Sequence, residues 1–409
     1  MVNYESKAIV YFMTNRCGAG CDFCGRSEND VEELPTDSVL RTIDQAYQAG
    51  IRDVDFTGGE ALLRYDDIIT CLKKVKSNKM RAGITTNSSY ANDAETGYRV
   101  ASELKEAGLT GFGFSLDYEH QESIPYSNVL NAVKGALQAD VKDIGIQSTV
   151  KKGTVHKTND LILRIVKDLG GKFDKKYSHI INVGERFVEY HAIAVNRAGR
   201  ANSLDRREFP RLCRINDEQK CDADDMTITN RGEIVPCCSF YSCSNGNYSI
   251  GNVNDIEIET ALKRVNHSVT DIMLSPFFSS RIITFLQKSE DKDAKRLLNK
   301  KYTLFCEFCN DLRSTPSVID PVIEEFNSYG KLPEFNFKEG KTGVKVDVIV
   351  DGREIDIFDY IGPVSSRDFW TGLLGYKLEL LDKKGDPENK RKELEESLER
   401  AKVLPKVEL

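Results

Sequence analysis

Short strand patterns alternate with longer helical patterns from residue 8 to about residue 200, and this alternation limits the chain to a few folds. A strand is predicted at residues 8–13, and alternating apolar and polar residues predict a second at residues 51–57. Between them, Thr36 can cap a helix that ends at Ala49 and Gly50. Further strands are predicted at residues 82–86, 111–116, 144–150 and 188–195, and further helices at residues 66–75, 94–108, 129–137 and 159–169.

Six strand–helix units joined by short turns predict parallel strands with helices on the outside. Three polar segments fall at the carboxyl ends of these strands: the segment after the first strand, Gly58-Gly59-Glu60 and Ser115. Barrels and open α/β sheets build their sites on this face. We therefore expect the functional site of the chain there.

The segment after the first strand carries Cys17, Cys21 and Cys24, with Phe23 directly before the last cysteine. Thiolates at this C-x3-C-x2-C spacing can hold three irons of a [4Fe–4S] cube and leave the fourth iron without a protein ligand. An open metal position is where chemistry takes place, while the surrounding protein tunes the cluster. The spacing predicts a cluster with an open iron site.

Gly58-Gly59-Glu60 closes the next predicted strand, about forty residues further on. In this order, the two features resemble the radical S-adenosylmethionine (radical SAM) enzymes, in which SAM chelates the unique iron. The resemblance implies an α/β fold, a partial (βα)6 TIM-like barrel. It also implies that Glu60 accepts the amino group of SAM, while Gly58 and Gly59 let the ligand approach the backbone.

Other segments extend the resemblance to SAM contacts. Thr85-Thr86-Asn87 and Ser115-Leu116-Asp117 resemble family sequences that end the third and fourth strands, which implies SAM contacts for Asn87 and Ser115. Arg200 lies in a Gly-Arg-Ala that some relatives carry after the sixth strand. One departure stands out, because the Asp-x-x-Arg that many relatives carry after Ser-Leu-Asp is missing here. A general base near the barrel mouth is one role open to Asp117, Glu119 and Glu122, but the favoured reading of each is a solvated loop acid. The five histidines are assigned no role.

The resemblance implies a reaction as well. One electron enters the cluster from a donor such as flavodoxin or ferredoxin, SAM is cleaved reductively, and the 5′-deoxyadenosyl radical removes a hydrogen atom from the substrate. The cofactor carries this step, and the barrel holds the substrate and keeps water out. No catalytic residue can be assigned from the sequence.

A second group of cysteines follows a nearly cysteine-free stretch. Cys221, Cys237, Cys306 and Cys309 could supply four thiolates, a set that suits zinc or an iron–sulfur cluster. Their order resembles the auxiliary-cluster extension called SPASM and its shorter Twitch form. No cysteine follows Cys309, so one auxiliary [4Fe–4S] cluster is favoured over two. Three further cysteines, Cys213, Cys238 and Cys243, could each replace one of these ligands. The remaining cysteine of the chain, Cys71, is read as a core residue.

These patterns divide the chain into a partial barrel at residues 1–205, an auxiliary-cluster domain at 206–315 and an extension of unknown role at 316–409. A net charge of −7 offers no field for nucleic acid or anionic lipid. No apolar run is long enough to span a membrane, and no secretory signal is found, so a cytoplasmic location is expected. In that reducing compartment clustered cysteines more often bind metal than form disulfides.

Three functions compete on this evidence. The leading hypothesis is modification of a side chain in a peptide or protein, because most resembling families with an auxiliary region act on peptides. The barrel pattern begins within ten residues of Met1, so a leader-binding surface is expected elsewhere, such as after residue 315. The alternative is oxidation, cyclisation or rearrangement of a small molecule such as an aminocyclitol or a nucleotide. A zinc-stabilised binding module without catalysis is the third.

Overall fold

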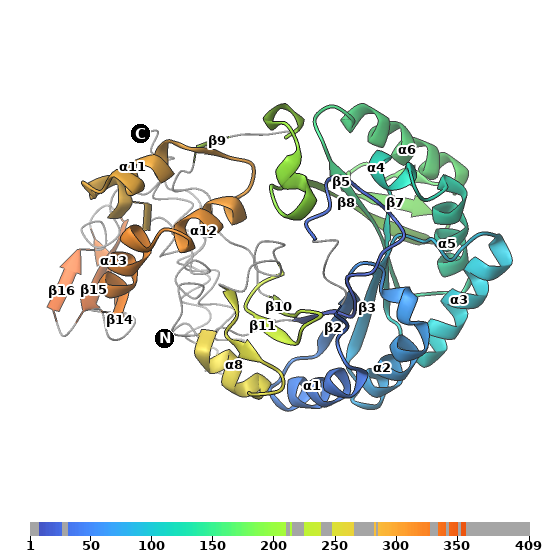
Figure 1. Ribbon diagram of the computed structural model, residues 1–409, viewed down its shortest axis with the longest axis horizontal. Helices are drawn as coiled ribbons and strands as arrows, with labels where there is room; N and C mark the ends of the chain where they lie inside the picture. The colour runs from blue at the N-terminus through green and yellow to red at the C-terminus, as the bar shows by residue number, and fades with distance from the viewer. Residues whose placement is uncertain are drawn as a thin grey trace.

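The computed structural model describes residues 8–26, 32–209, 213–214, 225–238, 248–265, 282–283, 285–327, 334–340, 343–350 and 353–356. Its centre is a curved sheet in which six parallel strands follow one another in the order β1-β2-β3-β4-β5-β8. In Figure 1 these strands follow one another along an arc. Their bounds are β1 Ala8–Phe12, β2 Asp53–Thr57, β3 Arg81–Thr86, β4 Gly111–Ser115, β5 Asp143–Val150 and β8 Arg186–Ala194. The predicted partial barrel is confirmed.

Helices cover the outer face of this arc (Figure 1). Apolar side chains from the helices and from alternate strand positions form one large buried core. In β2, for example, Val54 and Phe56 are buried in that core, whereas Asp55 lies on the opposite, inner face. The outer helices are α1 Thr36–Gln48, α2 Tyr65–Ser77, α3 Ala94–Ala107, α5 Tyr126–Gln138 and α6 Val155–Asp168, with the short η1 Ala61–Arg64 and α4 Tyr118–Gln121 between them.

The start of α1 differs from the sequence prediction. Thr36 is the first helical residue and not the cap, because the extended residue before it is Pro35. The Thr36 hydroxyl donates instead to Asp67 Oδ1 at 2.6 Å and so links α1 to α2. Cys71 is fully buried in α2, as predicted.

The sheet continues beyond the barrel at both ends. On one side β10 (Asp225–Ile228) pairs parallel with β1 and forms an antiparallel hairpin with β11 (Glu233–Val235), and β11 pairs in turn with β12 (Gly251–Asn252). On the other side an antiparallel pair that the sequence did not reveal, β6 (Lys172–Phe173) and β7 (Ile180–Val183), adds to β8. Strand β10, which lies in the segment that follows the barrel in the sequence, is therefore hydrogen-bonded directly to β1, the first barrel strand.

The remaining elements form smaller units. Helix α8 (Ile258–Val265) joins the main core, and α11, α12 and α13 pack around a second one. In the described part of the chain, no helix is long and apolar enough to cross a membrane. The bounds are η2 Gly199–Ser203, η3 Arg206–Glu208, β9 Cys213–Arg214, α11 Lys292–Asn299, β13 Lys301–Tyr302, α12 Phe305–Arg313, α13 Pro316–Asn327, β14 Glu334–Gly340, β15 Gly343–Val350 and β16 Arg353–Asp356.

Candidate functional site

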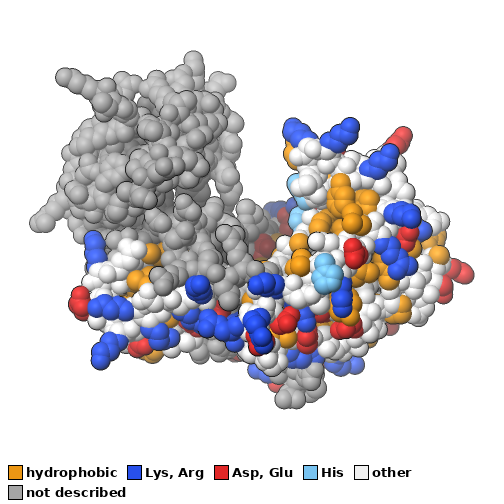
Figure 2. Space-filling model, turned by 90° about the horizontal axis from the view of Figure 1, so that it is seen from above, with side chains coloured by type: hydrophobic (Ala, Val, Ile, Leu, Met, Phe, Trp, Pro, Cys, Tyr) orange, Lys and Arg blue, Asp and Glu red, His pale blue; other side chains and the backbone are white. Residues whose placement is uncertain are grey.

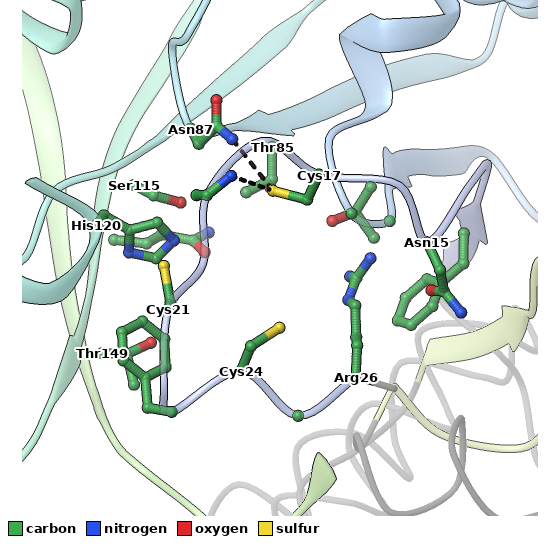
Figure 3. A pocket seen from close by; sticks show the side chains of 18 of the residues that line it. Asn15, Cys17, Cys21, Cys24, Arg26, Thr85, Asn87, Ser115, His120 and Thr149 are labelled. Atoms are coloured by element: carbon green, nitrogen blue, oxygen red, sulfur yellow. Dashed lines mark hydrogen bonds between the residues drawn. The ribbon is translucent and has the colours of Figure 1, made fainter. Parts of the chain in front are cut away.

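A cavity of about 770 Å³ lies at the carboxyl ends of the barrel strands, where the sequence predicted the site. Its volume falls within the range of ordinary small-molecule pockets. The structure brings together in its wall nearly all of the predicted residues of the first site: Cys17, Cys21, Cys24, Gly58, Gly59, Asn87, Ser115 and Arg200. Figure 3 shows the three cysteine side chains projecting from one loop toward a common space.

Hydrogen-bond donors surround the Cys17 sulfur. The backbone N–H of Ala19 and the Asn87 side-chain amide both donate to Cys17 Sγ, each at 3.4 Å (Figure 3). Burial raises the pKa of the Cys17 thiol, and these two donors oppose that shift by favouring the thiolate. A sulfur held in this way suits metal ligation.

The three thiols fit an iron–sulfur cube better than a single ion. No group of three or more His, Cys, Asp or Glu side chains in the described part of the chain is arranged to hold one metal ion. In a cube each iron takes its own thiolate, so the ligands stand further apart than around one ion. Three unpaired cysteines in one cavity wall, one of them receiving two N–H donors, form a matching donor set.

Gly58 and Gly59 fit tightly against the start of the cysteine loop. A Cβ atom on Gly59 would lie 2.0 Å from the Arg16 carbonyl oxygen, and one on Gly58 would lie 2.4 Å from the Thr14 carbonyl oxygen. Gly58 also has a φ of 140°, which disfavours other residues. The Gly59 N–H donates to Thr14 O at 2.6 Å. The glycine pair thus places the loop as well as lining the cavity.

Glu60 does not line the cavity. Its side chain is buried and accepts three hydrogen bonds, from the Leu62 N–H, the Thr86 hydroxyl and the Asn87 N–H, at 3.1, 2.9 and 2.8 Å. Burial raises the pKa of this carboxyl group, and the three donors counteract the rise. Glu60 therefore ties the end of β2 to the end of β3, and its contact with the SAM amino group stays a prediction.

Arg200 lies where a second segment packs on the cysteine loop. Its backbone N–H donates to Cys24 O at 2.9 Å. Gly199, with a φ of 52°, leaves no room for a side chain, because a Cβ there would lie 2.2 Å from the Gly25 carbonyl carbon. The Gly-Arg-Ala sequence thus has a clear packing role, and a SAM contact by Arg200 or Ser115 stays a prediction.

Sequence reasoning missed His120. The ring lines the cavity, interacts with the Cys21 side chain and packs edge-on against Phe23 with the ring centroids 5.2 Å apart (Figure 3). Its Nδ1 lies 2.8 Å from the fully buried Asp117 carboxylate. Burial alone would lower the pKa of His120, but the Asp117 charge raises it well above the ordinary value. The Asp-x-x-His spacing was the available signal.

The favoured reading of Asp117, Glu119 and Glu122 as solvated loop residues was wrong for Asp117 and Glu119, because both side chains are buried. Asp117 caps the short α4 helix, and Glu119 is buried beside Lys151. The Lys151 ammonium donates to Asp22 Oδ2 at 2.7 Å and lies 3.5 Å from Glu119 Oε1. Because Asp22 stands between Cys21 and Cys24, this ion pair anchors the cysteine loop to the segment after β5.

Among the second group of cysteines, the structure gathers Cys237, Cys306 and Cys309 around Tyr248. Burial raises the pKa of the Cys309 thiol, and the nearby Cys237 adds to the rise. Cys238 instead lines the first cavity. Three further residues lie where no side chain is described, so their contributions stay predictions: Cys213, Cys221 and Cys243.

Comparison with known proteins agrees with the resemblance that the cysteine spacing and the Gly-Gly-Glu segment indicated. The sequence model described as "Radical SAM superfamily" matches residues 11–163. A probable GTP 3′,8-cyclase from Methanosarcina acetivorans is 28% identical over 200 residues, which cover 44% of this chain and 56% of that protein. An Fe-coproporphyrin III synthase from Methanosarcina barkeri is 28% identical over 201 residues, 48% of this chain and 46% of the relative. The chain spans about half the length of the curated relatives it matches.

Among solved structures, one described as native anSMEcpe with bound AdoMet and Cp18Cys peptide is similar to this chain. The alignment covers 79% of this chain and 99% of that chain, with a TM-score of 0.45 and 12% sequence identity.

Proposed function

Residues 11–163 form a radical SAM domain, and we propose that the chain uses it to act on a small molecule of the nucleotide class. The observation that carries the catalytic part is the convergence of Cys17, Cys21 and Cys24 in one cavity wall. The cluster and SAM, when bound, supply reductive cleavage of SAM and a radical that takes a hydrogen atom from the substrate.

The residues of the chain hold and shield this chemistry. Asn87 and the Ala19 N–H fix the Cys17 sulfur, and Lys151 fixes the loop through Asp22. Glu60 holds the neighbouring strand ends at a fixed spacing. The barrel wall surrounds the cavity on the side away from the loop and limits the access of water to the reacting atoms.

The choice of substrate class rests on the relatives. Several curated relatives are named GTP 3′,8-cyclase, which supports the nucleotide alternative more than the peptide hypothesis that led the sequence analysis. The segment that matches the radical SAM sequence model, residues 11–163, includes the cysteine loop and the cavity-lining residues Asp55, Thr85 and Gln147. A peptide substrate is the competing case, and one experiment separates the two.

Anaerobically reconstituted protein is incubated with deuterated GTP, SAM and a reductant, and 5′-deoxyadenosine is analysed by mass spectrometry. We expect its formation to increase with GTP and deuterium to appear in it. The control carries Cys17→Ala, Cys21→Ala and Cys24→Ala together and should form none. If GTP, ATP and other nucleotides leave 5′-deoxyadenosine unlabelled while a deuterated peptide labels it, the nucleotide proposal is wrong.

A further inference from the structure

The inner face of the barrel continues the cavity below the cysteine loop, and two glycines make room for polar groups there. Asp55 on β2, Thr85 on β3 and Gln147 on β5 all line the cavity. We call these three residues the polar floor. A Cβ on Gly83 would lie 1.9 Å from Asp55 Oδ1, so the carboxylate occupies the space that Gly83 leaves. A Cβ on Gly113 would lie 3.3 Å from Thr85 Oγ1 and 3.7 Å from Gln147 Nε2.

Strand register explains this arrangement. Asp55 pairs with Gly83, Gly83 with Gly111, and Gly111 with Asp143, so at this level of the sheet two residues without side chains separate the Asp55 and Asp143 carboxylates. Thr85 pairs with Gly113 one level higher, which also lacks a side chain. Barrel interiors are normally filled by branched apolar residues. Here the cavity is lined at these levels by the polar side chains of Asp55, Thr85 and Gln147, beside glycines on the neighbouring strands.

The Asp55 carboxylate can accept hydrogen bonds from a ligand in the cavity. The accessible surface of its side chain faces the cavity, inside the arc of strands. Among the described residues no hydrogen bond reaches it, and the nearby Arg81 pairs with Asp53 at 2.5 Å. Burial, together with the charges of Asp225 and Asp53, raises the pKa of Asp55 to about 6, and Arg81 offsets part of this rise. A carboxylate in such surroundings is stabilised by a ligand that brings N–H donors.

Charge is distributed unevenly along the cavity. Arg16, Arg26 and Arg200 line it near the cysteine loop, whereas Asp55 lines it at the floor. A molecule with an anionic end and an N–H donor end would therefore orient with the donors toward β2. Nucleotides have this polarity, and guanine presents two adjacent N–H donors on one edge.

We propose that the polar floor is the substrate anchor and that Asp55 accepts two hydrogen bonds from an N–H edge of the substrate, as guanine offers. This deepens the proposed function and rests on it for the choice of a nucleotide. Asp55 positions and selects the substrate, and Thr85 and Gln147 complete the floor with a hydroxyl and an amide.

Equilibrium binding to the reconstituted protein tests the anchor without turnover. The probes are GTP, ITP, which lacks the exocyclic amino group, and agmatine, a guanidinium without phosphate. The variants are Asp55→Asn and, as a charge-matched control on the outer helix α6, Asp160→Asn. We expect Asp55→Asn to weaken GTP at least about tenfold and to abolish the preference for GTP over ITP. The control and the affinity for SAM should be unchanged.

A pair of glycine variants keeps the test valid if Asp55→Asn fails to fold. Gly83→Ala places a methyl group on the Asp55 oxygen and should weaken GTP similarly. Gly111→Ala, on the neighbouring strand, meets only ordinary contacts, the nearest being the Gly83 Cα at 3.7 Å, and should bind as the unaltered chain does.

The outcomes separate the anchor from the function. Equal binding of GTP and agmatine by Asp55→Asn and the unaltered chain overturns the anchor, and so does a matching loss of SAM binding. If the unaltered chain binds no nucleotide, the nucleotide function is wrong. The agmatine arm then decides the anchor: weaker binding by Asp55→Asn supports it, and no binding by the unaltered chain overturns it.

Discussion

Single contacts around the cysteine loop have consequences that can be measured. The Asn87 amide donates to Cys17 Sγ, and hydrogen bonds to cluster sulfurs and their ligands influence reduction potential and metal retention. We predict that Asn87→Ala makes the cluster harder to reduce and lowers 5′-deoxyadenosine formation about 10–100-fold. A redox titration followed by electron paramagnetic resonance measures the first effect.

A matched control for this change is Asn131→Ala. That side chain also donates a single hydrogen bond, to Ala91 O at 3.1 Å, but it lies on α5. Equal reduction potentials for Asn87→Ala and Asn131→Ala would contradict the assigned role of Asn87.

Asp55 should make stability depend on pH. Its pKa rises from 3.8 to about 6 on folding, so the folded chain binds this proton more tightly than the unfolded chain does. The stabilising contribution is complete below about pH 4 and is lost as the pH rises through 6. Asp53, Arg81 and Asp225 are the charged neighbours that enter this shift. Between pH 5 and 7.5, the melting temperature of Asp55→Asn should fall less with rising pH than that of Asp160→Asn. Identical slopes of melting temperature against pH for the two variants would contradict this role of Asp55.

At the scale of elements, the junction between β2 and the cysteine loop is the most tightly packed part of the site. Gly59→Ala would force a methyl group to 2.0 Å from a backbone oxygen, which no side-chain movement can relieve. We predict a loss of about 1–3 kcal/mol in unfolding free energy and a lower iron content. Gly145→Ala on β5, where nothing lies within 4 Å of the added methyl, is the control. Iron content equal to the control would show that the junction tolerates the shift.

The elements also show why some features could be predicted and others not. Strands and helices of the barrel follow from local apolar periodicity, and the cysteine positions follow from spacing along one loop. The pairing of β10 with β1 could not be predicted, because it joins segments more than 200 residues apart. His120 and Asp55 were missed for a related reason. Their roles depend on Cys21 and Gly83, which other elements bring beside them.

For the whole molecule, the number of clusters is the clearest quantity to measure. We predict that Cys221, Cys237, Cys306 and Cys309 hold one auxiliary cluster, and the described members Cys237, Cys306 and Cys309 already lie near Tyr248. Replacing Cys17, Cys21 and Cys24 by alanine should then remove about half of the iron. Retention of all iron would contradict the first site, and loss of all iron would contradict the auxiliary one.

The surface of the described part of the chain agrees with its modest net charge of −7. Figure 2 shows basic and acidic side chains interspersed on one face, without a field of a single sign over the described area. Such a surface gives little long-range attraction for a polyanion. The charge separation that bears on recognition lies inside the cavity, between the loop arginines and Asp55.

The parallel pairing of β10 with β1 makes the barrel depend on a segment far along the chain. A shortened chain ending at residue 205 would keep every cysteine of the first loop. Without β10, however, Ala8–Phe12 would become an exposed edge strand whose backbone amide and carbonyl groups lack partners on one side. We predict that this shortened chain aggregates on expression, whereas one ending at residue 265 stays in solution, as size-exclusion chromatography would show.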